Sequence, residues 1–101
     1  LPTAPALMGN TVVWKPAPTQ QFAAHFVMRL LEEAGLPPGV VNMVTGDGIA
    51  VSEVALADRD LAGIHFTGST AVFQHLWRTV GTGIDRYRGY PRIVGETGGK
   101  D

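Results

Sequence analysis

The residues Thr67-Gly68-Ser69-Thr70 have the types and order that suit an anion-binding turn. Gly68 has no Cβ, so its backbone can approach a ligand closely. The helix predicted after this turn begins with free N–H groups and a partial positive charge, which suit a pyrophosphate, and the hydroxyls of Ser69 and Thr70 can add hydrogen bonds. The alternative is that Ser69 only caps its helix, and on these four residues alone the cap is the favoured interpretation.

Two charged residues stand beside predicted strands. Lys15 follows a short apolar strand, where an ammonium group can meet a ribose hydroxyl or a phosphate. Glu96 follows another predicted strand and precedes two glycines, where a partly desolvated carboxylate can act as a general base. The alternatives are a solvated lysine and a solvent-facing loop acid, and the pattern alone favours both alternatives.

Other chemistry is weakly represented. His25, His65 and His75 lie in separate predicted elements, and their spacing matches no metal motif. The chain has neither a GxGxxG sequence nor a phosphate-binding loop of the GxxxxGK[ST] type, and it has no cysteine. We therefore expect no metal site and no disulfide.

The elements that must position these residues alternate between two periodicities. Predicted strands cover residues 11–14, 40–44, 61–66 and 91–95. Helices are predicted after a Thr19 cap up to Gly35, over about 49–57, and after Thr70 until Gly81. The apolar residues of the first helix share one face: Phe22, Ala23, Phe26, Val27, Leu30, Leu31 and Ala34. This βαβαβαβ order predicts an α/β fold with a Rossmann-like parallel sheet and helices on both faces.

The composition of the chain excludes some classes of binding partner. The net charge is −1 and no Lys/Arg run occurs, so we expect no nucleic-acid binding. No apolar run approaches the ~20 residues that a membrane span needs. Charged residues make up only 17 % of the chain, which indicates that some faces pack against protein outside it. We therefore expect a fragment of a longer protein, and the absence of an initiator methionine also fits a fragment.

Four motifs in order resemble the aldehyde dehydrogenase superfamily. They are Gly9-Asn10-Thr11-Val12-Val13-Trp14-Lys15-Pro16, the segment from Gly35 to Asn42, His65-Phe66-Thr67-Gly68-Ser69-Thr70, and Glu96-Thr97-Gly98-Gly99-Lys100. Two further stretches look like the 1-pyrroline-5-carboxylate dehydrogenases within it: Phe73-Gln74-His75-Leu76-Trp77 and Tyr90-Pro91-Arg92-Ile93-Val94-Gly95.

The resemblance implies NAD-linked oxidation of glutamate semialdehyde to glutamate by the complete enzyme, and a partial NAD-binding domain over residues 1–101. It implies that Lys15 binds the adenosine ribose and that Glu96 activates the hydrolytic water. It also implies that the residues after the third strand hold the pyrophosphate and the adenine edge: Gly68, Ser69, Thr70, Ala71 and Val72. A cytoplasmic homo-oligomer is expected, or a mitochondrial-matrix enzyme in a eukaryote.

This sequence departs from the family pattern in four ways. The family's oxyanion-hole asparagine is expected before Leu1, outside this chain. The nucleophilic cysteine of the family is absent, so the chain alone is expected to be inactive. Ala17-Pro18 stands where many relatives place a ribose-binding acid, which leaves the preference for NAD over NADP open. Phe73 replaces a usual glycine. The alternatives to the semialdehyde enzyme are an aldehyde dehydrogenase with another substrate and a non-catalytic nucleotide-binding module.

Overall fold

The helices and strands alternate along the chain as the periodicity predicts. The computed structural model describes residues 1–99. Its elements are α1 (Thr3–Leu7), β1 (Val12–Trp14), the 3-10 turn η1 (Pro18–Gln20), α2 (Gln21–Glu33), β2 (Val41–Met43), α3 (Gly48–Ala57), β3 (Gly63–Gly68), α4 (Thr70–Thr82), the 3-10 turn η2 (Ile84–Arg86) and β4 (Arg92–Thr97). The chain divides into two compact units, Leu1–Val51 and the part that begins at Ser52.

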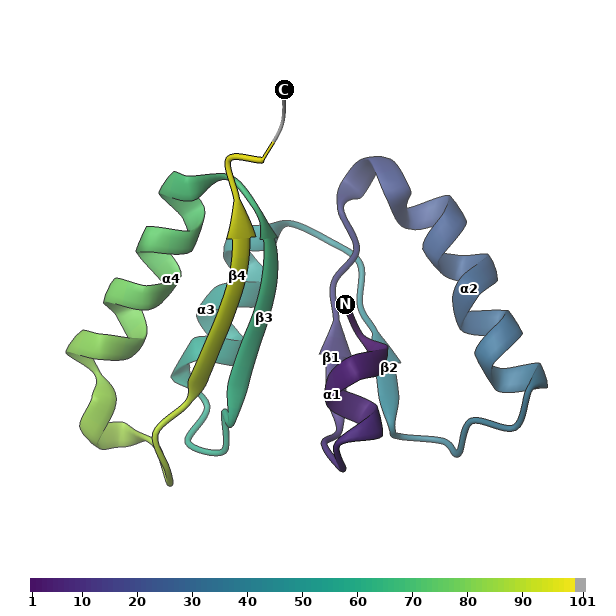
Figure 1. The fold of residues 1–101 in the computed structure, drawn as a ribbon, viewed down its shortest axis with the longest axis horizontal. Helices are drawn as coiled ribbons and strands as arrows, with labels where there is room; N and C mark the ends of the chain where they lie inside the picture. Colours follow the sequence, from purple (N-terminus) through teal and green to yellow (C-terminus); the bar gives the residue numbers. More distant parts are fainter. Residues whose placement is uncertain (100–101) are drawn as a thin grey trace. The chain divides into compact units, whose positions relative to one another are not determined.

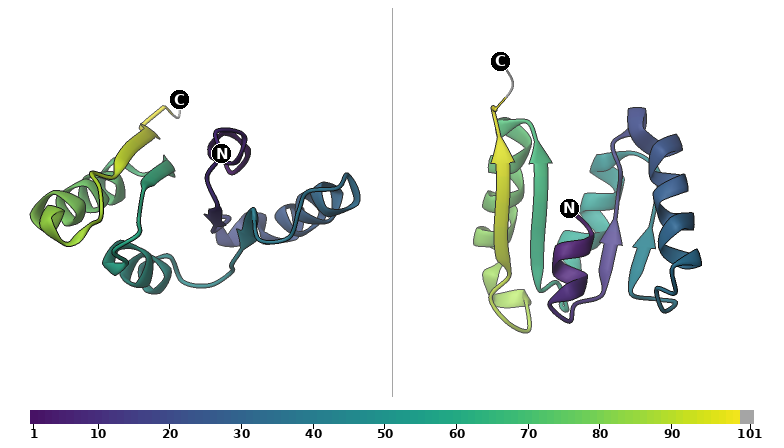
Figure 2. Two further views of the ribbon diagram at one scale, coloured as in Figure 1. Left: turned by 90° about the horizontal axis from the view of Figure 1, so that it is seen from below. Right: turned by 45° about the vertical axis from the view of Figure 1, so that its right-hand side comes forward.

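The strands pair in parallel, which confirms the predicted fold class. In the first unit β1 lies beside β2 (Figure 2). Val12 lies opposite Val41 in this pair. In the second unit β3 lies beside β4 along six residue pairs, from Gly63–Arg92 to Gly68–Thr97 (Figure 1). The four predicted strands therefore form two two-stranded sheets.

Helix α2 ends where the sequence predicts. Gly35 has φ +100°, a conformation that side chains with a Cβ rarely adopt. The Gly35 N–H donates to the Glu32 carbonyl, and the Leu36 N–H donates to the Leu31 carbonyl. These bonds use carbonyls that the helix end would otherwise leave unpaired.

One detail of α2 was predicted wrongly. Thr19 is not its cap, because it lies inside η1 and Gln20 occupies the N-cap position without a side-chain bond. The shared apolar face is largely exposed in this chain: Phe22, Phe26 and Leu30 are exposed, whereas Ala24 is buried. The apolar residues of α2 span a wide arc of the helix surface. The rest of the first unit packs against only a narrow part of that surface.

The core of the second unit joins both of its helices to one sheet face. Its buried residues are Leu56, Leu76, Val80 and Tyr87, and the partly buried residues packed against them are Leu61, Ile64, Phe66 and Ile93. Because Ile64, Phe66 and Ile93 share one face of β3–β4, α3 and α4 pack on that same face. In the described part of this unit both helices therefore lie on one face of the sheet.

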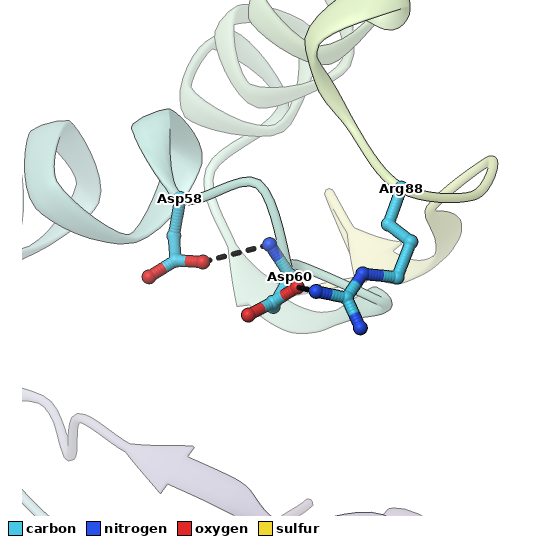
Figure 3. Close-up of polar contacts among 3 residues, drawn as sticks. All are labelled: Asp58, Asp60 and Arg88. Atoms are coloured by element: carbon cyan, nitrogen blue, oxygen red, sulfur yellow. Dashed lines mark hydrogen bonds and ion pairs between the residues drawn. The ribbon is translucent and has the colours of Figure 1, made fainter.

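Polar contacts hold together the chain at the amino ends of β3 and β4. Asp58 Oδ1 accepts a hydrogen bond from the Asp60 N–H at 2.7 Å, and Asp60 forms an ion pair with Arg88 at 2.9 Å (Figure 3). Both partners of the pair are largely exposed, so we assign it about 0–1 kcal/mol. The Tyr87 hydroxyl donates to the Leu56 carbonyl at 2.6 Å and is buried. Tyr87 therefore anchors the 81–90 connection, whose structure the sequence left open.

Candidate nucleotide site and general base

The start of α4 is a capped helix N-terminus. Ser69 is extended, with φ −75° and ψ 147°, and its Oγ accepts a hydrogen bond from the Val72 N–H at 3.2 Å. This confirms the cap. The first N–H groups of a helix have no acceptor within it, so Thr70 and Ala71 offer backbone donors to an anion. The Ser69 hydroxyl accepts in the cap and still has a hydrogen to donate, so the cap and an anion contact are compatible.

Gly68 also leaves space for a neighbouring side chain of its own strand. A Cβ added to Gly68 would lie 2.6 Å from Cζ of Phe66, two residues earlier on the same face. The sequence had suggested close approach to a ligand as the reason for this glycine. The structure supplies an additional reason, because the Phe66 ring occupies the space of a side chain at position 68.

Glu96 lies one residue before the end of β4, opposite Thr67 of β3. It is therefore part of the strand, whereas the sequence placed it after the strand. Side chains alternate along a strand, and both Ile93 and Gly95 face α4, so Glu96 lies on the opposite face at the carboxyl edge. Its side chain is exposed, so the second unit alone does not desolvate it.

Phe73 and Gly95 form a matched pair beside Glu96. A Cβ on Gly95 would overlap the Phe73 ring. Phe73 also stacks on Phe66, with ring centroids 5.8 Å apart and planes at 10°. The aromatic side chain on α4 is therefore accommodated by a glycine on β4, a relation that sequence reasoning missed. Phe73 was noticed in the sequence because it replaces a usual glycine. Its contact with Gly95 could not be predicted, because Gly95 lies 22 residues later.

Lys15 lies in the first unit, directly after β1. It is half-buried, and a Cβ on Gly48 would lie 3.5 Å from Lys15 Nζ. Gly48 is the first residue of α3, and Asp47 Oδ2 accepts a hydrogen bond from the Ala50 N–H in the first turn. The ammonium group of Lys15 thus lies beside the start of α3, at the carboxyl end of β1, and is not a fully solvated lysine.

The structure places most of the predicted site residues at one edge of the second unit's sheet, but the Glu96 side chain lies on the face opposite α4. At the carboxyl edge of β3–β4 lie Gly68, Ser69, Thr70, Ala71, Val72 and Glu96. Open parallel sheets bind ligands at this edge. Among residues 1–99 no group of histidine and acidic side chains is placed to hold a metal ion. No helix in the same range is long and apolar enough to cross a membrane.

Comparison with known proteins identifies the family. The model of the aldehyde dehydrogenase family matches residues 2–101. The chain is 48 % identical, over its full length, to the delta-1-pyrroline-5-carboxylate dehydrogenase of Agaricus bisporus, and it covers 18 % of that protein. It is 49 % identical over 97 % of its length to the mitochondrial enzyme of that name from Mus musculus, of which it covers 17 %.

A solved structure matches the chain more closely in sequence. The Delta-pyrroline-5-carboxylate dehydrogenase from Mycobacterium tuberculosis, crystallised with NAD, is 75 % identical over the whole chain with a TM-score of 0.96. The chain covers 19 % of that structure. The matched segment therefore spans about a fifth of these proteins, and it contains every motif on which the resemblance rests. The chain belongs to the aldehyde dehydrogenase family.

Proposed function

We propose that this chain is part of an NAD-dependent 1-pyrroline-5-carboxylate dehydrogenase that oxidises glutamate semialdehyde to glutamate. The observation that carries this proposal is the 75 % identity, over the whole chain, to a protein of that name crystallised with NAD. The capped start of α4 agrees with the proposal, because it offers backbone donors at the carboxyl edge of a parallel sheet.

The proposal assigns a role toward the dinucleotide to each predicted binding residue. The amides of Thr70 and Ala71 and the hydroxyl of Ser69 would donate to the pyrophosphate. The Val72 amide is already bonded to Ser69, so Val72 would contribute its side chain, which is 47 % exposed, to the adenine edge. Lys15 would bind the adenosine ribose. The bound cofactor would accept the hydride, and these residues would hold the cofactor in position.

Glu96 would act as the general base of the hydrolytic step. It would take a proton from water as that water attacks the acyl group on the enzyme, which is typical work for a positioned carboxylate. Glu96 is exposed in this unit, and desolvation makes a carboxylate a stronger base. The proposed role therefore requires that other parts of the complete enzyme cover Glu96.

The isolated 101-residue chain is expected to show no aldehyde oxidation. It contains no cysteine, so it cannot form the covalent thiol adduct on which the family's reaction depends. The measurement is NADH absorbance with glutamate semialdehyde and NAD. Turnover above the rate in buffer alone would contradict the proposal that the reaction requires residues outside this chain.

The substrate is tested with the complete enzyme and a panel of aldehydes. We expect kcat/KM with NAD to be highest for glutamate semialdehyde and lower for aliphatic aldehydes of similar length. Preference for another aldehyde would assign the chain to a different branch of the family, and binding of NAD without turnover of any aldehyde would support a nucleotide-binding module.

The Mus musculus relative is named mitochondrial. The compartment and the oligomeric state of the complete protein stay predictions.

A further inference from the structure

One side-chain contact joins the start of α4 to the end of β4. Thr70 Oγ1 donates a hydrogen bond to Thr97 Oγ1 at 3.0 Å. Thr70 is the first residue of α4 and Thr97 is the last residue of β4. The bond therefore links the proposed phosphate-binding turn to the residue that directly follows Glu96.

The chain changes direction immediately after this contact. Gly98 has φ +67°, and a Cβ on Gly98 would lie 3.4 Å from Thr70 Oγ1. Gly98 therefore also passes close to the first residue of α4. The end of a strand is where a backbone opens most readily, so a side-chain bond at its last residue limits fraying there.

Contacts with α4 lie on both sides of Glu96 in the sequence. On one side the Phe73 ring covers Gly95, and on the other side Thr70 binds Thr97. Residues 95 and 97 share the sheet face that α4 covers, while Glu96 points to the other face. Holding the neighbours of Glu96 on one face fixes the direction of its Cα–Cβ bond on the other.

We propose that Thr97, held by Thr70, is a positioning residue for Glu96. The contact would couple the helix start that binds the cofactor phosphates to the carboxylate that activates water. Thr97 itself touches no reacting atom in this account. The inference rests on the proposed function, because it requires Glu96 to be the base.

The test removes the hydroxyl from the complete enzyme without changing the size of the side chain. In Thr97→Val we expect kcat to fall about 2- to 10-fold, the range that corresponds to one hydrogen bond. The Kd for NAD, measured by quenching of tryptophan fluorescence, is expected to change by less than about 2-fold, because the amides of the turn are retained. Thr97→Ser keeps a hydroxyl and is expected to restore kcat.

A second variant and a matched control make the result specific. Thr70→Val breaks the same bond from an exposed residue, and its effect on kcat should not add to that of Thr97→Val. Thr79 makes a comparable threonine bond, from its Oγ1 to the His75 carbonyl at 2.8 Å, further along α4. Thr79→Val is therefore expected to leave kcat unchanged.

The outcomes separate this inference from the proposed function. If Thr97→Val and Thr70→Val keep full kcat while Glu96→Gln loses it, the positioning role is wrong and the function of Glu96 stands. A lower melting temperature with unchanged kcat would also overturn the positioning role, since the bond would then only support the fold. If Glu96→Gln keeps full kcat, the base assignment fails, and the positioning role fails with it.

Discussion

Replacement of Glu96 by glutamine in the complete enzyme is expected to lower kcat for aldehyde oxidation by about 10²- to 10⁴-fold, the contribution usual for a general base. Glutamine has nearly the same shape but cannot accept the proton of the attacking water. The side chain lies at the carboxyl edge of β3–β4 and is exposed, so its replacement removes little packing. We therefore expect the melting temperature to stay nearly constant while steady-state turnover falls.

Glu53 provides the matched control for this experiment. It is an exposed glutamate on α3 and has no part in the proposed chemistry. Glu53→Gln should leave kcat within about 2-fold of the parent enzyme, because surface substitutions away from special features have small effects. A Glu96→Gln enzyme as active as the Glu53→Gln enzyme would show that another group activates the water.

Replacement of Leu76 by alanine is expected to destabilise the complete enzyme by about 2–5 kcal/mol. Leu76 is 6 % exposed and belongs to the core that joins α3 and α4 to β3–β4. Truncation removes apolar contact and leaves a cavity that close-packed neighbours fill only in part. The free energy of unfolding, obtained from denaturant titration of the transition that includes this unit, measures the effect.

Gln74 on the same helix is the control for the core substitution. It is exposed, so Gln74→Ala should change the free energy of unfolding by no more than about 0.5 kcal/mol. A Leu76→Ala change as small as that of Gln74→Ala would mean that the core of the second unit lies elsewhere.

The parts of the fold that local chemistry determines could be predicted from the sequence. The four strands, the Gly35 ending of α2 and the Ser69 cap all depend on residues close together in the chain. The ends of β3 and β4 were placed two residues too early, because pairing with a distant strand extended each of them. The residue pattern within one strand does not show which distant strand it pairs with.

The face that α2 buries could not be predicted for a similar reason. Its apolar residues cover a wide arc, and the sequence cannot say which side meets the rest of the unit. Tyr87 was missed because its buried position depends on a hydrogen bond to Leu56, 31 residues earlier. The contacts of Phe73 with Gly95 and of Thr70 with Thr97 likewise join residues that only the parallel pairing of β3 and β4 brings together.

The most direct test is a crystal structure of the complete enzyme with NAD bound. We expect the pyrophosphate within hydrogen-bonding distance of the Thr70 and Ala71 amides, with the Glu96 carboxylate facing the space above the nicotinamide ring. A pyrophosphate bound away from the start of α4, or a Glu96 carboxylate directed away from the nicotinamide, would contradict it.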